Sequence, residues 1–227
     1  MDSHALTNPL DVCPPERRHL LERFGEMLAE MNQRVNLVSR ESIAERWVRH
    51  ILHSLCLGLR RFPTGARVVD WGTGGGLPCI PLAIAFPDVE FVGIDAVGKK
   101  IMAVRAMVRR LGLDNVEMVQ TRAEEWDGET NYSVSRATAP LSSLWAWHER
   151  GVGKGRRDLL PLDPDDSSAL VCWPPGLVCL KGGDLREEIE HLKEDNPGTV
   201  VEVLPLAELV PISEFVGKQI VVVTADR

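Results

Sequence analysis

The chain has 227 residues, of which 44% are hydrophobic and 26% charged, and its net charge is −7. This size and composition are those of a globular protein with a full core, and the acidic balance argues against a protein that coats nucleic acid indiscriminately. No apolar run approaches the roughly 20 residues that cross a bilayer, and no basic region followed by an apolar stretch opens the chain, so neither a membrane span nor a secretory signal is expected.

The five cysteines, at positions 13, 56, 79, 172 and 179, form no C-x-x-C pair and are odd in number. This pattern argues against a disulfide framework and a zinc site, so we expect no metal and a cytoplasmic location. Charge is unevenly spread, because residues 184–214 carry nine acidic and two basic side chains, whereas residues 13–61 carry nine basic and six acidic ones. The basic side of such a molecule suits RNA, although the basic helix expected at 98–111 is equally explained as a solvated face.

The first 63 residues are expected to form a helical cap that folds as one unit with the main domain, residues 64–227. After two prolines, apolar side chains recur at helical spacing from Leu20 to Met31. Residues 32–39 break this period and predict a connector. Ser42 and Glu45 then have the spacing of a capping box that begins a second helix.

From residue 66 the chain alternates between short apolar runs and helical patterns. Strands are predicted at 67–71, 90–95, 115–120, 133–135, 176–180, 200–204 and 219–224, and helices at 78–85, 98–111 and 185–193. The alternation predicts an α/β fold with a doubly wound, Rossmann-like, mostly parallel seven-stranded sheet. The last two strands are expected to pair antiparallel, because no long helix separates them. Residues 150–175, rich in Gly, Pro, Asp and Ser, predict a surface insert.

The turn after the first strand carries the strongest chemical signal. Asp70 closes the strand, and Gly72, Gly74 and Gly76 alternate through the turn. A dinucleotide fingerprint starting at Gly72 requires glycine at position 77, which is Leu77, and an acidic residue before the first glycine repels a pyrophosphate but can hold a cationic amino-acid moiety. An NAD-dependent oxidoreductase is therefore disfavoured. The turn resembles the first motif of class I S-adenosylmethionine methyltransferases, the alternative being a turn that serves only strand–helix packing.

Two further turns lie where the next strands are expected to end. Asp95, followed by Ala96, ends the second strand, where a carboxylate accepts both ribose hydroxyls of a bound nucleoside; alternatively, it caps the helix that follows. After the third strand come Arg122, Ala123 and Glu124. Ala123 and Glu124 are positioned to recognise an adenine edge, unless this is an ordinary loop.

Seven short motifs occur in the order and spacing of one family. They are Asn36-Leu37, Arg49-His50-Ile51-Leu52, the loop of residues 70–81, Asp95 with Lys99-Lys100, Arg122-Ala123-Glu124, Ser135-Arg136-Ala137 and Leu180-Lys181-Gly182. Outside the insert, from about Leu20 onward, the chain resembles the glucose-inhibited division protein B family, the 16S rRNA guanine-N7 methyltransferases (RsmG). The resemblance implies the class I fold, S-adenosylmethionine as cofactor, and 16S rRNA of the small ribosomal subunit, at a guanine of its decoding region, as substrate. A monomer is the expected state.

The resemblance also implies roles for individual positions. Cofactor contacts are implied for Asp70, Gly72, Gly74, Gly76, Leu77, Asp95, Ala96, Ala123, Glu124 and Arg136. Positions around the catalytic cleft are Asn36, His50, Arg122, Arg136 and Lys181. Without the family, His50 is equally explained as a core histidine, and Arg122 and Arg136 as partners of carboxylates such as Glu124 or Glu125.

Three positions depart from the family pattern. His53 stands where Asp is usual, Cys79 where Gly is usual, and Lys218 where Arg is usual. A lysine keeps the charge of an arginine but loses its bidentate phosphate geometry.

The implied nucleophile sets the chemistry that the protein must provide. Guanine N7 is an unprotonated lone pair, so its attack on a sulfonium methyl needs no general base, and catalysis is expected to be mostly positioning. Arg136 and Lys181 are then expected to orient phosphate or O6. Two rival functions stay open: a class I methyltransferase acting on a different RNA, a protein or a small molecule, and a non-catalytic module that binds RNA or the cofactor.

Overall fold

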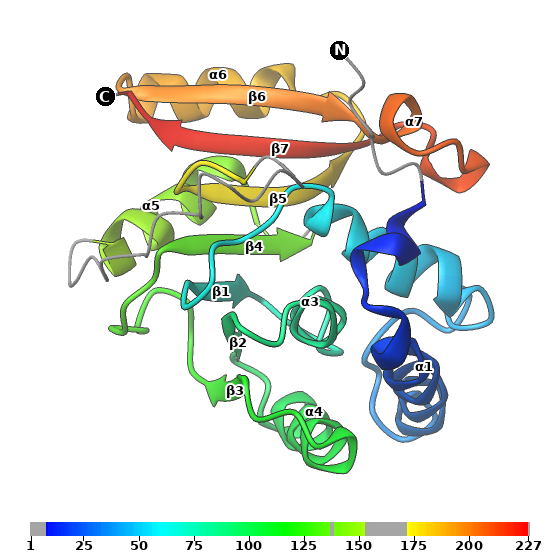
Figure 1. The fold of residues 1–227 in the computed structure, drawn as a ribbon. Helices are drawn as coiled ribbons and strands as arrows, with labels where there is room; N and C mark the ends of the chain where they lie inside the picture. The colour runs from blue at the N-terminus through cyan, green and yellow to red at the C-terminus, as the bar shows by residue number, and fades with distance from the viewer. Residues whose placement is uncertain (1–7, 137–138, 153–171, 227) are drawn as a thin grey trace.

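The computed structural model describes residues 8–136, 139–152 and 172–226, and in this part of the chain a seven-stranded sheet is covered by helices on both faces (Figure 1). The strands are β1 (Arg67–Trp71), β2 (Glu90–Asp95), β3 (Val116–Gln120), β4 (Tyr132–Arg136), β5 (Leu177–Gly182), β6 (Thr199–Pro205) and β7 (Lys218–Ala225). The helices are α1 (Arg18–Asn32), α2 (His53–Leu55), α3 (Cys79–Ala85), α4 (Gly98–Leu111), α5 (Leu141–Val152), α6 (Arg186–Asp195) and α7 (Leu206–Leu209). A π-helix, η3 (Trp47–Leu52), leads into α2, and 3-10 turns lie at η1 (Pro9–Val12), η2 (Pro15–Arg17), η4 (Cys56–Gly58) and η5 (Ser213–Phe215). None of the helices described is long and apolar enough to cross a membrane.

The strand order is β3-β2-β1-β4-β5-β7-β6, in which β1 to β5 run parallel. β7 pairs antiparallel with both β5 and β6. The predicted doubly wound sheet and its terminal antiparallel pair are confirmed. Because the chain moves outward from β1 to β3 and then returns to the other side of β1, the carboxyl ends of β1 and β4 flank the crevice where such folds bind ligands.

The two faces of the sheet carry separate hydrophobic clusters. Successive side chains of a strand point to opposite faces, so Val68 belongs to the cluster under α1, α3 and α4, and Val69 to the cluster under α5 and α6. Burial on both faces explains why these strands are continuous apolar runs rather than alternating ones. The second cluster is rich in tryptophan, with Trp71, Trp126 and Trp145 all buried.

The N-terminal helix packs directly on the sheet-covering layer. Phe24 and Leu28 of α1 are fully buried in one cluster with Ile80 of α3 and Val104 of α4. This shared core brings the segment that follows α1 to the carboxyl edge of the sheet. The boundary at residue 63 stays a prediction.

The second predicted helix begins later than expected. The Glu45 N–H donates to the Ser42 carbonyl oxygen at 3.2 Å, and the regular helix starts only at Trp47, as η3. The Ser42 hydroxyl instead contacts Nε2 of His50 and donates to the Ser39 carbonyl. The capping-box prediction is wrong, because a side chain beyond the first turn competes for the capping hydroxyl.

The sequence patterns predicted neither helix α5 nor the burial of Trp173. Buried side chains recur at helical spacing along α5, at Leu141, Leu144, Trp145 and His148, a period that is visible in the sequence. Within the predicted insert, residues 153–171 lie outside the described residues. Trp173, near the end of the insert, is 2% exposed, and its Nε1 donates to the Leu57 carbonyl at 2.7 Å. The prediction that this position lies on the surface is therefore wrong.

Candidate functional site

The loop between β1 and α3 has a backbone that requires glycine. Gly72, Gly74 and Gly76 have φ values of 72°, 54° and 82°, in the left-handed region that side chains rarely adopt. A Cβ on Gly76 would also lie 2.7 Å from Cδ1 of Ile80. The Thr73 N–H donates to the Ile94 carbonyl at 2.8 Å, which fixes the loop to the end of β2.

The segment that follows α1 closes over this glycine loop. A Cβ on Gly75 would lie 3.2 Å from both Cδ1 of Leu28 and Cβ of Leu37. Oδ1 of Asn32 accepts hydrogen bonds from the N–H groups of Leu37 and Val38, at 2.8 and 3.0 Å, and so fixes the segment. The sequence prediction named Asn36 here, which is exposed, and missed Asn32, whose side chain organises the turn.

Asp70, at the end of β1, is a buried carboxylate with one satisfied oxygen. Its Oδ2 accepts from the Cys79 N–H at 3.2 Å, whereas Oδ1 makes no hydrogen bond within the described structure. Burial raises the pKa of Asp70 to about 7, against the lowering effects of the nearby Thr73 hydroxyl, the Cys79 N–H and the Arg136 charge. A buried, half-satisfied carboxyl suits a cationic ligand group, which stabilises the ionised form.

The ends of β1, β2 and β3 surround a cavity of about 200 Å³. Its walls are Gly72, Ile94, Asp95, Ala96, Thr121, Arg122, Ala123, Glu124 and Trp147. Six of these positions were predicted from the sequence: Gly72, Asp95, Ala96, Arg122, Ala123 and Glu124. We call this space the Asp95 cavity.

The carboxylate of Asp95 is oriented by two loops. Oδ2 accepts from the Gly74 N–H at 3.1 Å, and Oδ1 accepts from the Val97 N–H at 2.8 Å. The alternative that Asp95 caps α4 is not supported, because the N-cap residue is Val97 and it makes no side-chain capping bond. The carboxylate therefore has a fixed direction on the wall of the cavity.

Apolar walls complete the Asp95 cavity. Ile94, Ala123 and Trp147 line the cavity together with the carboxylates of Asp95 and Glu124. Apolar walls with a few placed polar groups fit a ribose and its attached planar base. Trp147 belongs to α5, and its ring centroid lies 5.9 Å from that of Trp71. Sequence reasoning missed Trp147 because it missed the helix that carries it.

A second cavity, of about 300 Å³, opens at the same edge of the sheet, beside the end of β4. We call it the Arg136 cavity. Its lining residues are Ser42, Arg49, His50, His53, Arg136, Glu214, Phe215 and Lys218. Three cationic side chains and one carboxylate give it a positive balance, which favours an anionic ligand.

Arg136 and His50 form the centre of this cavity. Nη1 of Arg136 donates to Nδ1 of His50 at 2.7 Å and to the Arg49 carbonyl at 3.3 Å. Because a guanidinium only donates, Nδ1 of His50 is the acceptor and Nε2 carries the proton, which it directs at the Ser42 hydroxyl 2.9 Å away. Burial, followed by the Arg136 charge, lowers the pKa of His50 to about 4.

The charge of Arg136 persists despite its partial burial. Removal from water lowers its pKa to about 10, against the raising effect of Asp70. The guanidinium therefore remains protonated at neutral pH. The same charge reaches His53, whose pKa is lowered to about 3, mostly by burial.

His53, one of the departures from the family pattern, is packed against the wall of the Arg136 cavity. Its ring is tilted on Phe215 with centroids 5.5 Å apart, and its Nε2 has no hydrogen-bond partner in the described structure. Lys218, the second departure, is exposed on the rim of the same cavity. Cys79, the third, is fully buried in α3.

Lys181 lies in neither cavity. Its Nζ donates to the Ala139 carbonyl at 2.6 Å and forms an ion pair with Oε1 of Glu188 at 2.5 Å. The same Oε1 accepts from the Leu141 N–H at 2.8 Å. The side chain is 9% exposed, so these contacts fix the start of α5 against β5.

The remaining predicted positions belong to the loops around the cavities. Gly74 and Gly76 shape the glycine loop, and Leu77 is buried at 3% exposure. Across the described parts of the chain, no three His, Cys, Asp or Glu side chains gather in a group able to hold a metal ion.

Comparison with known proteins gives one family and one fold. The family described as GidB, rRNA small subunit methyltransferase G, matches residues 17–160. The ribosomal RNA small subunit methyltransferase G of Salinibacter ruber is 50% identical over 215 residues, which cover 95% of each chain. The protein of the same name from Chlorobaculum tepidum is 40% identical over 210 residues, covering 89% of this chain and 87% of its own.

Solved structures share the fold at low sequence identity. A ribosomal protein L11 methylase from Lactobacillus delbrueckii subsp. bulgaricus superposes with a TM-score of 0.54 and 13% identity, over 79% of each chain. A variant of the protein MtNAS, solved in complex with S-adenosylmethionine, superposes with a TM-score of 0.53 and 17% identity, over 93% of this chain and 76% of its own. At these identities the likeness extends to the fold alone.

Proposed function

The chain belongs to the rRNA small subunit methyltransferase G family, and from that premise we propose that it transfers a methyl group from S-adenosylmethionine to N7 of a guanine in the decoding region of 16S rRNA. The observation that supports this function is the pairing of two cavities at one edge of the sheet. The Asp95 cavity has the lining of a nucleoside site, and the Arg136 cavity is lined by three cationic side chains and one carboxylate. One therefore suits the cofactor and the other a nucleotide of the substrate.

The residues around the glycine loop and the Asp95 cavity fit the cofactor. Asp95 accepts hydrogen bonds from the ribose hydroxyls. The carboxyl of Asp70, whose Oδ1 has no hydrogen-bond partner in the described structure, pairs with the cationic amino-acid end of the cofactor. Ala123 and Glu124 lie along the adenine edge. The full proposed set is Asp70, Gly72, Gly74, Gly76, Leu77, Asp95, Ala96, Ala123, Glu124 and Arg136.

The protein contributes position rather than proton transfer. Bound S-adenosylmethionine supplies an electrophilic methyl group on a sulfonium. Guanine N7 carries an unprotonated lone pair at neutral pH, so the reaction leaves no proton for the protein to remove. His50 is neutral, with Nδ1 occupied by Arg136, and it holds that guanidinium toward the cavity. Arg136 then fixes O6 or a phosphate of the target nucleotide at near-attack distance.

Three further residues support this arrangement. Arg122 lies on the wall of the Asp95 cavity, where its guanidinium is available to RNA. Asn36 is exposed on the segment that closes the glycine loop and is assigned an RNA contact. Lys181 acts as a positioning residue, through the Ala139 carbonyl and Glu188, for the chain that leaves β4.

The biological setting follows from the same proposal. We assign the small ribosomal subunit as partner, the cytoplasm as location, and a monomer without metal as the working form. Residues 1–63 act as a helical cap on the catalytic domain, residues 64–227, and the two fold as one unit through the core that Phe24 and Leu28 share with it.

A labelling experiment tests the reaction, the atom and the substrate together. The protein is incubated with methyl-labelled S-adenosylmethionine and small subunits from cells that lack the endogenous modification, and the RNA is then cleaved at 7-methylguanine with borohydride and aniline. A single break in the decoding-region hairpin is the expected result. Label in RNA without cleavage would refute the N7 assignment, and cofactor binding without any label in RNA would favour another substrate or a non-catalytic module.

A further inference from the structure

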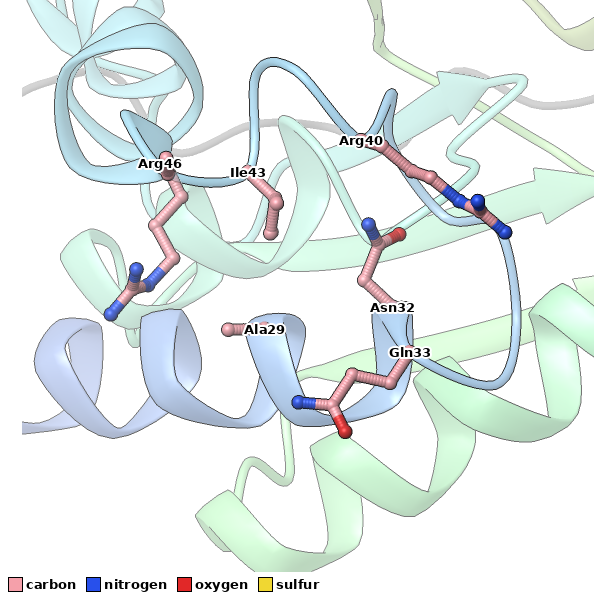
Figure 2. Close-up of a pocket in the computed structure, with 7 residues that line it drawn as sticks. Ala29, Asn32, Gln33, Arg40, Ile43 and Arg46 are labelled. Carbon is pink, nitrogen blue, oxygen red and sulfur yellow. The ribbon is translucent and has the colours of Figure 1, made fainter.

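A groove of about 470 Å³ lies between the end of α1 and the segment of residues 39–46 (Figure 2). It is lined by Ala29, Asn32, Gln33, Arg40, Ile43, Ala44 and Arg46, and no carboxylate belongs to this lining. We call it the α1 groove. Neither of the two cavities described above includes any of these residues, so the groove is a separate feature of the surface.

The two arginines of the α1 groove are not engaged by a carboxylate of the described residues. In the parts of the chain that the structure describes, the side chains of Arg40 and Arg46 make no ion pair. Of the three acidic residues next to the lining, Glu30 and Glu45 are each paired with an arginine outside it. Glu41 follows Arg40 in the chain and is exposed. The lining itself carries two guanidinium groups and no carboxylate, a balance that attracts a ligand with more than one negative charge.

The rest of the lining offers amide donors and an apolar middle. Oδ1 of Asn32 is occupied by two backbone N–H groups, so its Nδ2 remains available as a donor. Figure 2 shows Arg46 at one end of the groove and Arg40 at the other, with Ile43 between them, facing α1 near Ala29. Guanidinium and amide donors around an apolar surface match the phosphates and nucleosides of a single-stranded nucleic acid.

The α1 groove adjoins the Arg136 cavity through a shared wall. The segment of residues 39–46 contributes Arg40, Ile43 and Arg46 to the groove, and Ser42 to the cavity. Ser42 is in turn hydrogen bonded to His50, 2.9 Å away. A ligand strand that leaves the cavity therefore reaches the groove by crossing a single short segment.

We propose that the α1 groove binds the phosphate backbone of the rRNA substrate beside the nucleotide in the Arg136 cavity, with Arg40 and Arg46 each on a phosphate. The inference rests on the proposed function, since it takes RNA as the substrate. It adds a second RNA contact surface, formed by the N-terminal helical region, to the contacts at the sheet edge. The role of this surface is affinity and orientation, because phosphate contacts carry no base specificity.

The test compares a double variant, Arg40→Gln with Arg46→Gln, with the wild-type protein. Binding to unmodified small subunits and to their isolated 16S rRNA is measured across a salt series. Removing two phosphate contacts is expected to raise the Kd about 10-fold or more and to reduce the slope of log K against log salt by about 1.4. The KM for the subunit should rise with kcat retained, and cofactor binding should be unchanged.

A charge-matched control separates the groove from the net charge. The variant Arg186→Gln with Lys193→Gln also removes two positive charges, but from α6, where Arg186 is paired with Asp184 at the surface. It should leave the Kd and the salt slope at wild-type values. The variant Arg40→Lys with Arg46→Lys should keep most of the salt slope while weakening binding, because lysine retains charge but not the fork geometry.

The outcomes distinguish this inference from the proposed function. If the Gln double variant keeps the wild-type Kd and salt slope, with cofactor binding and thermal unfolding intact, the α1 groove does not bind RNA. The proposed methyl transfer is not affected by that result. RNA binding that depends on Arg40 and Arg46 in a protein that transfers no methyl group to rRNA would support the groove and refute the reaction. A wild-type protein without affinity for either RNA probe would overturn both.

Discussion

The Arg136 guanidinium donates a hydrogen bond to Nδ1 of His50 at 2.7 Å and so joins the end of β4 to the π-helix η3. The bond has two consequences. It assigns the proton of the neutral imidazole to Nε2, and it ties the N-terminal helical region to the edge of the sheet where the two cavities open. Substitutions of Arg136 and of His50 test the two members of this pair separately.

Replacing Arg136 by alanine is expected to lower kcat/KM for unmodified small subunits by about 100-fold or more, because a charged donor aimed at the substrate is lost. The Kd for the cofactor should change much less, since nine of its ten proposed contacts are residues other than Arg136 and five of them line the Asp95 cavity. Arg136→Lys should recover part of the activity. Wild-type turnover by Arg136→Ala would refute the proposed role.

The variants of His50 distinguish an orienting residue from a general base. His50→Asn keeps an acceptor near the position of Nδ1 and should retain activity within about 10-fold, whereas His50→Ala should lose more. Because the pKa of His50 is about 4, kcat at saturating substrate should show no inflection from this group near neutral pH. An inflection that disappears in His50→Asn would contradict the orienting role.

Cofactor affinity should depend on the protonation of Asp70. Its pKa of about 7 means that the carboxyl is partly protonated at neutral pH, and a cationic ligand group binds the ionised form more tightly. The Kd for S-adenosylmethionine, measured by calorimetry, should therefore fall as pH rises from about 6 to about 8. Asp70→Asn should bind weakly with little pH dependence. Asp88→Asn, at an exposed turn, is the control and should behave as wild type.

Acid should destabilise the protein through its buried histidines. Burial lowers the pKa of His50, His53 and His148 to about 4, 3 and 4. The unfolded chain takes up these protons near pH 6.5, so the free energy of unfolding falls as pH drops from about 6.5 toward 4. Asp70 acts in the opposite direction, because its folded pKa is raised above the unfolded value, and it offsets one of the three groups.

Urea unfolding at about pH 7.5 and about pH 5 measures this effect. His148→Asn removes one titrating group away from both cavities, although it also alters the hydrogen bond to Ser133. The difference in unfolding free energy between the two pH values should shrink by about 2 kcal/mol in the variant. An unchanged difference would mean that His148 is protonated in the folded state.

The ion pair of Lys181 and Glu188 should contribute to stability as well as to activity. Lys181→Ala leaves a partly buried carboxylate with only the Leu141 N–H as partner. Lys181→Ala should lower the free energy of unfolding, and adding Glu188→Gln should restore part of it, with a coupling of about 1–3 kcal/mol. If Lys181 contacts only the substrate, Lys181→Ala will leave urea unfolding unchanged and the coupling will be absent.

Much of the fold follows from patterns that are local in the sequence. Apolar runs and helical periods located the strands and most of the helices, because burial on one or two faces leaves a period of its own in the sequence. The glycine loop is equally predictable from the sequence, because the positive φ values of Gly72, Gly74 and Gly76 exclude most side chains. The carboxyl ends of neighbouring parallel strands meet at one edge, which explains why Asp95 and Ala123 share a cavity.

The sequence by itself therefore determined the doubly wound sheet, the glycine loop and the positions of the strand-end carboxylates. Only the tertiary structure decided which partner each polar side chain takes. Ser42 has the spacing of a helix cap but contacts His50, and Lys181 pairs with Glu188 rather than lining a cavity. Trp147 reaches the Asp95 cavity from a helix far along the chain. Periodicity records which face of an element is buried, whereas hydrogen bonds and cavity walls join residues distant in sequence, and those contacts exist only once the elements have packed.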